Sequence, residues 1–286
     1  MKKTLLSILL LFIIGCASVQ VETPRPEHLE AKLISEVSSI EPGVPFWVGL
    51  LLEMEEGWHV NWKNPGDAGL APTIKWELPE GFKADEIAWP IPARIKVPPF
   101  VLFGYEDKVV LPVRITPPNG LAGDKNIKIK ADCDWVVCGD VCVPGSAILE
   151  MALPVNSSNP NIDPKWATEF AATREKLPDA YSVGGLSASA TVNSIIIEYI
   201  PTVLEFPKFD SMVFFPEVQG IINNAADQKL TTSGSHYRLE IERDKLVGNL
   251  PETVNGIIAF KSVAFPLWTK GIYAVIPLSK SFGIRN

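Results

Sequence analysis

Residues 126–144 decide how this chain folds, and they read NIKIKADCDWVVCGDVCVP. Every second residue from 127 to 137 is apolar or small, and most of the residues between them are polar. This period of two predicts an antiparallel strand that carries Cys133 on its apolar face and Cys138 on the opposite face. Gly139 and Asp140 are turn residues, so we expect the chain to reverse there and form a hairpin.

The length of the turn decides whether Cys138 and Cys142 face each other. With a three-residue loop they are directly opposed, and opposed Cα atoms lie about 4.5 to 5.5 Å apart, a separation that a disulfide tolerates. Val141 speaks against this loop, because its last position usually takes a positive φ, which is costly for a β-branched residue. A two-residue turn would place Val137 opposite Cys142 and make any bridge diagonal and strained. Both alternatives remain open.

The cysteine content favours a reactive pair over structural staples. The chain has four cysteines, and three of them lie within ten positions, whereas disulfide-stapled secreted domains are usually short and carry an even number. A bridge around three residues adds little stability, and strain or exposure at a loop tip makes a disulfide easier to exchange. A permanent hairpin staple is the alternative. Cys133 is expected to be a small buried apolar residue.

The first residues have the features of a bacterial lipoprotein signal. Residues 1–15 combine Lys2 and Lys3 with an apolar run, and Gly15 precedes Cys16. This predicts a signal peptide over 1–15 and lipidation of Cys16, with an ordinary secretory leader as the alternative. The absence of Asp after Cys16 resembles lipoproteins sent to the outer membrane. We therefore expect a periplasmic protein held by a lipid anchor.

Charge and length exclude several classes of function. Residues 1–15 hold two lysines and no acids, so their removal changes the formal net charge from −7 to −9 and makes nucleic acid an unfavourable partner. The remaining 271 residues can build a core without staples, and no apolar run after Cys16 is long enough to span a bilayer. The sequence has no Gly-rich phosphate loop, nucleophile elbow or metalloprotease helix, and no cofactor is predicted.

Short apolar runs separated by Pro and Gly predict an all-β protein. We expect two immunoglobulin-like antiparallel β-sandwich domains joined by a linker with one short helix. The expected boundaries are a tether over 16–31, a first domain over 32–156, a helical linker over 157–189 and a second β domain over 190–286. Strands are predicted at 45–54, 73–78, 109–115, 126–137, 146–155, 194–200, 212–216, 237–241, 256–263 and 272–278, and a helix at 164–176.

Several motifs in order resemble a known family. They are GWHVNWKNPGDAG at 57–69, IAWP at 87–90, FGYE at 103–106 and WVVCGDVCVP at 135–144. Together they are similar to the periplasmic amino-terminal domain of DsbD-type thiol:disulfide interchange proteins, and most similar to the ScsB-like branch associated with suppression of copper sensitivity. The likeness covers roughly residues 30–156, and residues 190–286 resemble the second β domain of that branch more loosely.

The resemblance implies a redox role for Cys138 and Cys142. In this family a membrane-embedded domain reduces the pair, and the pair reduces thioredoxin-like periplasmic proteins, so the implied activity is that of a thiol:disulfide oxidoreductase component. Large members contain the membrane domain and a thioredoxin domain, which are missing from this sequence, and the donor is therefore expected on a separate chain. A loop with an aromatic residue shields the pair in the family, and the candidates here are Phe100, Phe103 and Tyr105. Core packing is the alternative for these three.

Two other functions stay open at this point. Cys133, Cys138, Cys142 and His59 could bind zinc or Cu(I) and link the protein to metal tolerance, although Cys133 should face away from the other two cysteines. We therefore predict no metal site, and Cys133 is left as a possible accessory thiol. The second alternative is a non-catalytic, lipid-anchored scaffold.

Overall fold

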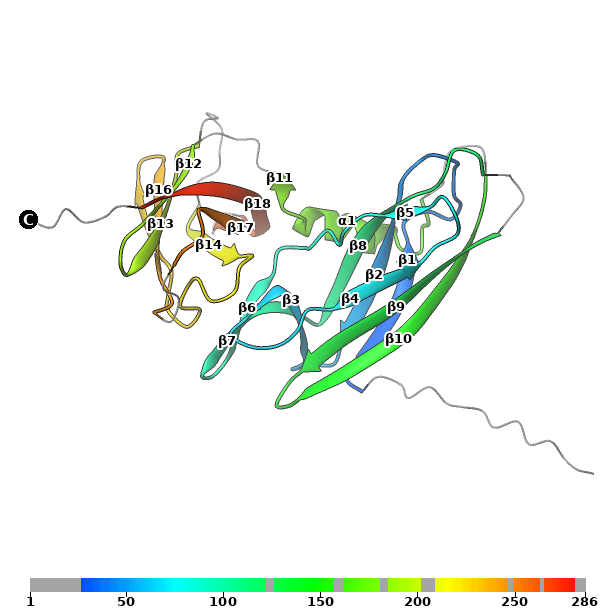
Figure 1. The fold of residues 1–286 in the computed structure, drawn as a ribbon, viewed down its shortest axis with the longest axis horizontal. Coiled ribbons are helices and arrows are strands. Elements are labelled where there is room, and N and C mark those ends of the chain that lie inside the picture. Colours follow the sequence, from blue (N-terminus) through cyan, green and yellow to red (C-terminus); the bar gives the residue numbers. More distant parts are fainter. Residues whose placement is uncertain are drawn as a thin grey trace, which may run out of the picture.

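The computed structural model describes residues 27–121, 126–156, 162–180, 185–201, 209–245, 249–262 and 265–280. Figure 1 shows two groups of strands with the helix α1 (Ala167–Lys176) between them. The protein is mostly β, as predicted, and the described residues contain one α-helix, α1.

The first group of strands forms two sheets. One contains, in spatial order, β1 (Leu29–Ser35), β2 (Phe46–Met54), β8 (Lys108–Thr116) and β5 (Lys83–Ala84). The other contains β10 (Cys142–Pro154), β9 (Asn126–Cys138), β3 (His59–Gly66), β7 (Phe100–Glu106) and β6 (Ala93–Val97), and β4 (Thr73–Glu77) also pairs with β9. Strand β1 begins three residues before the expected start of the first domain at residue 32.

Apolar residues from both sheets share one buried core. Leu50 on β2 and Leu111 on β8 belong to the same cluster as Val60 on β3 and Phe103 on β7, and none of the four is exposed. Alternation in β9 follows the prediction, because Cys133, Trp135 and Val137 are all buried in this cluster. The period of two in the sequence therefore reports which face of β9 is covered.

The second group of strands forms one sheet, which differs from the expected antiparallel sandwich. Its order is β14 (Ser211–Pro216), β17 (Thr253–Ser262), β18 (Phe265–Lys280), β12 (Leu186–Ala190), β13 (Ser194–Tyr199), β16 (His236–Glu242) and β15 (Lys229–Ser233), and β11 (Asp179–Ala180) also pairs with β18. Both β12 and β11 run parallel to β18. The expectation of a purely antiparallel domain is thus wrong here, because β11 and β12, which follow α1 in the sequence, pair in parallel with the long β18. Immunoglobulin-like topology stays a prediction.

Helix α1 packs against the first group of strands. It begins at Ala167 and not at the predicted residue 164, because the residues just before it form a turn in which Asp163 Oδ1 accepts a hydrogen bond from the Lys165 backbone N–H at 2.9 Å. Phe170 is buried in a small cluster with Ile34, Leu51 and Val110. The helix is therefore fixed to the outer face of the β1–β2–β8 sheet.

The two groups of strands also contact each other directly. Phe215 on β14 makes edge contacts with Phe103 on β7 and with Trp62 on β3, at ring-centroid distances of 5.2 and 6.3 Å. Polar contacts surround this aromatic cluster. Asn64 Nδ2 donates to the Pro216 carbonyl at 2.7 Å, Gln219 Nε2 donates to the Gly66 carbonyl at 2.8 Å, and Lys63 pairs with Glu217. Strand β3 thus carries one side of the contact between the two groups.

Candidate active site

The hairpin of β9 and β10 ends in a three-residue loop. Both strands are 13 residues long, and their register places Cys138 opposite Cys142. The Gly139 backbone N–H donates to the Val141 carbonyl at 2.9 Å and closes the loop. Val141 does not adopt the costly positive φ that was expected at the last position of this loop. The non-glycine residues with positive φ in the described ranges are His28 and Asp107. Of the two turns considered from sequence, the three-residue loop is the one that forms.

Cys138 and Cys142 form a disulfide at the tip of this hairpin. The S–S distance is 2.06 Å and the Cα atoms are 4.1 Å apart. The two cysteines differ in exposure, since Cys138 is only 2% exposed whereas Cys142 is exposed. Thiol–disulfide exchange requires an attacking sulfur to reach the bridge, so Cys142 is the accessible end.

Two further side chains lie level with the disulfide on the same face of the sheet. His59 on β3 is the register partner of Cys138 on one side and of Glu106 on the other. Glu106, His59, Cys138 and Cys142 therefore form a row across β7, β3, β9 and β10, and directly opposed residues point to the same face.

His59 is an unusual member of this row. It is 3% exposed, and its Nε2 has no hydrogen-bond partner among the residues that the structure describes. Burial lowers the pKa of His59 below its ordinary value of 6.5, since the charged form loses its hydration. The imidazole is consequently neutral at neutral pH.

Trp58 packs against the loop next to Cys138. A Cβ added at Gly139 would lie 3.1 Å from the Trp58 ring, so the indole sits directly on the backbone of the turn. The His28 ring stacks on the Trp58 ring with centroids 3.8 Å apart, and His28 Nδ1 lies 2.6 Å from Glu55 Oε2. Trp58 and His28 are thus neighbours of the turn that carries the disulfide.

Cys133 lies on the opposite face of β9 from Cys138. It has no exposed surface, and burial together with the charges of Asp132 and Asp134 raises the pKa of its thiol to about 12. No group of three or more His, Cys, Asp or Glu side chains that could hold a metal ion occurs within the described ranges. The three-thiolate arrangement considered from sequence is therefore not assembled.

The three aromatic residues considered as a shield are distributed along β7. Phe103 is fully buried against Phe215, and Tyr105 is buried with its hydroxyl donating to the Pro90 carbonyl at 2.7 Å. Phe100 is 47% exposed and lies six residues from Glu106, which is about 20 Å along a strand. The pairing of β7 and β3 therefore does not bring Phe100 to the level of the disulfide, and the other two pack in the core.

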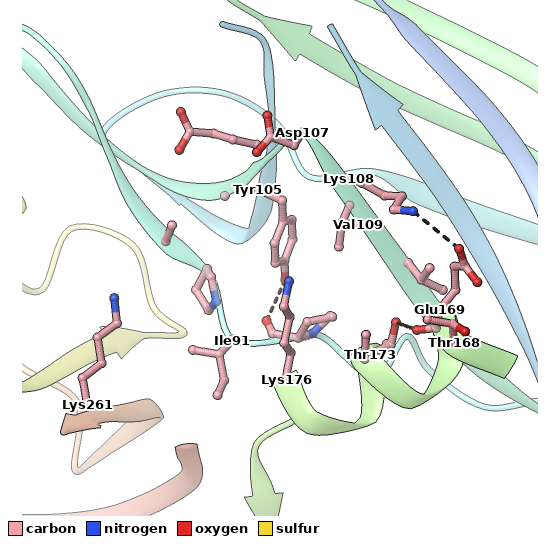
Figure 2. A pocket seen from close by; sticks show the side chains of 17 residues that line it. Ile91, Tyr105, Asp107, Lys108, Val109, Thr168, Glu169, Thr173, Lys176 and Lys261 are labelled. Carbon is pink, nitrogen blue, oxygen red and sulfur yellow. Dashed lines mark hydrogen bonds and ion pairs between the residues drawn. The ribbon is translucent and has the colours of Figure 1, made fainter. Parts of the chain in front are cut away.

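A cavity of about 510 Å³ lies between the two groups of strands and α1. Figure 2 shows Lys108 near Glu169 in the wall of this cavity, where Nζ and Oε1 are 3.5 Å apart. Tyr105, which also lines the cavity, donates its hydroxyl to the Pro90 carbonyl. Lys176 of α1 and Lys261 of β17 also line this cavity. It reaches Glu106 but neither cysteine of the disulfide, and we assign it no role.

From the sequence, His59 is a candidate metal ligand or a packed residue, and no local pattern predicts its place opposite Cys138. Its pairing joins residues 79 positions apart, which no local pattern reveals. The run Gly57-Trp58-His59 was the available signal, because both neighbours of the disulfide occur in it. Cys16 lies outside the described residues. No helix of the described residues is long and apolar enough to cross a membrane.

Comparison with known proteins identifies relatives of this arrangement. Residues 25–154 match the family described as the N-terminal domain of the thiol:disulfide interchange protein DsbD. The N-terminal periplasmic domain of ScsB from Proteus mirabilis is similar in structure with a TM-score of 0.62 and 15% identity, over 89% of this chain and 95% of that one. A protein of unknown function from Porphyromonas gingivalis W83 aligns over 88% and 100% with 11% identity, but its TM-score of 0.22 is too low to inform on the fold. No curated protein matches the chain.

Proposed function

Because residues 25–154 match the family of DsbD N-terminal domains, we propose that Cys138 and Cys142 are the redox pair of this protein. The family carries out thiol:disulfide interchange, and its domains exchange electrons with thioredoxin-like periplasmic proteins. The observation that carries the proposal is the disulfide itself, which joins two opposed residues at a hairpin tip, one buried and one exposed.

The unequal exposure of the two cysteines suggests the order of events. In the reduced protein, the Cys142 thiolate attacks a sulfur of the partner's disulfide, forms a mixed disulfide and releases the partner's other sulfur as a thiolate. Cys138 then attacks Cys142, which restores the Cys138–Cys142 bond and releases the partner as a dithiol. Two electrons and two protons pass from this protein to its partner. The reverse sequence accounts for reduction by a donor.

The location and the donor are part of the same proposal. We propose that Cys16 carries a lipid that anchors the protein to the outer membrane from the periplasmic side, and that a membrane-embedded protein on a separate chain reduces the pair. We also propose a role in copper tolerance, which the sequence motifs shared with the ScsB-like branch imply.

Trapping of a mixed disulfide tests the redox role. In the native envelope, Cys138→Ala leaves the exposed Cys142 thiol without its resolving partner, so this variant should accumulate a covalent complex with a thioredoxin-like protein. Cys142→Ala should trap less, because the remaining Cys138 is buried. Non-reducing electrophoresis with mass spectrometry identifies the complex.

Cys133→Ala is the matched control for this experiment. It removes a buried thiol on the other face of the same strand and should trap nothing, as in the unmodified protein. If neither Cys138→Ala nor Cys142→Ala captures a partner, the pair is a structural staple and the non-catalytic scaffold becomes the better explanation.

A further inference from the structure

We infer that His59 accepts the proton of the Cys138 thiol when this buried cysteine attacks the mixed disulfide. This inference rests on the proposed redox function and adds a residue to it. It assigns to His59 the task of making a thiolate from a cysteine that water does not reach.

The strand register places the imidazole next to Cys138. His59 is the residue of β3 directly opposite Cys138 on β9, and the neighbouring pair Val60 and Val137 points into the core on the other face. Cβ atoms of directly opposed residues lie about 4.5 to 5.5 Å apart, so an imidazole can reach a sulfur across the pair. On the other side of His59, β7 presents Glu106 at the same level.

The unsatisfied nitrogen of His59 has a natural explanation in the reduced state. A buried polar atom without a hydrogen bond costs free energy, and native proteins contain few of them. In the disulfide state Cys138 has no proton to donate. Reduction creates an S–H group on the residue directly opposite His59, and the unsatisfied Nε2 can then accept its hydrogen bond.

The protonation state of His59 suits an acceptor. Burial lowers the pKa of His59, so the ring is neutral at pH 7 and has a free lone pair. The titratable groups that face it across the sheet are Glu106 on β7 and the cysteines on β9 and β10. On the adjacent Trp58, the His28 ring is stacked, and His28 is paired with Glu55. Cys138 needs such an acceptor because burial favours the neutral thiol over the thiolate.

The resolving step then balances without a further reagent. The Cys138 thiol gives its proton to His59, and the Cys138 thiolate attacks the Cys142 sulfur. The bond between Cys142 and the partner breaks, the Cys138–Cys142 bond forms, and the partner's sulfur leaves with the electron pair as a thiolate. The imidazolium returns its proton to that thiolate or to water.

Reaction of the reduced full-length protein with dithiobis(nitrobenzoate) separates the two steps. Attack by Cys142 releases one coloured thiolate, and resolution by Cys138 releases a second, so stopped-flow absorbance should show two phases. All measurements use a Cys16→Ser, Cys133→Ala background, so that Cys138 and Cys142 are the two thiols that can react. In His59→Phe the second phase should slow by about tenfold or more at pH 7, while the first phase stays within about twofold. His236→Phe, a change of the same kind in the second group of strands, is the matched control.

The pH profile of the second phase is an independent readout on the unaltered His59. Its rate should fall as the pH drops below about 6.5 and through the lowered pKa of His59, because the protonated ring cannot accept a proton. This inflection should be missing in His59→Gln, which keeps a polar side chain if the Phe variant does not fold. A second phase whose rate and pH profile are the same in the parent and in both variants overturns the role of His59. If the parent itself shows no second phase, the redox function fails, whatever His59 does.

Discussion

Cys133 and Cys138 are five residues apart on one strand and have opposite chemical environments. Cys133 faces the core between the sheets, where burial and two flanking carboxylates keep its proton in place. Cys138 faces the other side and is joined to an exposed cysteine. The odd separation along the strand therefore places the buried Cys133 thiol and the Cys138–Cys142 disulfide on opposite faces.

We predict that Cys133 is unreactive in the folded protein. With a pKa of about 12, about one molecule in ten thousand carries the thiolate at pH 8, and the thiolate is the reactive species. Iodoacetamide at pH 8 should therefore add no label at Cys133 in the native oxidised protein and one label at Cys133 after denaturation, as measured by peptide mass spectrometry. Labelling of the native protein at Cys133 would contradict its burial.

The turn residues left the opposition of Cys138 and Cys142 as one of two alternatives, whereas the position of Cys133 could be predicted from local sequence, because period two is a local property. The neighbourhood of the pair could not. Strand β3 was missed although its first five residues alternate between polar and apolar. His59, Asn61 and Asn64 are buried together with Val60 and Trp62, so the polarity of these residues does not report which face is covered. Strand β7 was missed because residues 101–105 are all buried.

At the scale of elements, β3 connects the disulfide with the second group of strands. Its first residue, His59, lies opposite Cys138, and its later residues Lys63 and Asn64 contact Glu217 and Pro216. The close approach of β7 holds β3 in this position. Gly104 of β7 lies so near to β3 that an added Cβ would be 2.2 Å from the Val60 carbonyl oxygen.

Gly104→Ala should therefore destabilise the protein. The contact is with backbone and cannot be relieved by a side-chain rotation, so we expect the free energy of unfolding in urea to fall by about 1 to 3 kcal/mol or more. Displacement of β3 should also disturb the row that contains His59 and Cys138. Gly120→Ala is the control, because a Cβ there meets nothing within 4 Å and should change the stability little. Equal stability of the two variants would contradict the close packing of β3 and β7.

At the scale of the whole molecule, the two groups of strands share an aromatic contact and one hydrophobic cluster. Phe215 is 4% exposed and contributes from β14 to a cluster that includes Trp62 and Phe103 of the first sheets. The similar fold of the ScsB domain covers 89% of the chain, so the likeness extends over both groups. Composition and strand spacing predicted two β regions, but the contact between them joins residues more than 100 positions apart and was not predictable from local pattern.

Because this contact is well packed, we expect the unmodified protein to unfold in one transition and Phe215→Ala to unfold in two. Loss of a buried Phe ring costs about 3 to 5 kcal/mol, and here the loss falls on the contact between the groups. Seven of the eight tryptophans precede residue 186, so fluorescence follows the first group, whereas far-ultraviolet circular dichroism follows both. The two probes should coincide in the unmodified protein and separate in Phe215→Ala.

Phe209→Ala removes an equally buried ring that packs on Phe260 within the second group, at a centroid distance of 4.4 Å, and serves as the comparison. Two probes that still coincide in Phe215→Ala would mean that the groups are coupled by the polar contacts around β3 and not by the aromatic cluster.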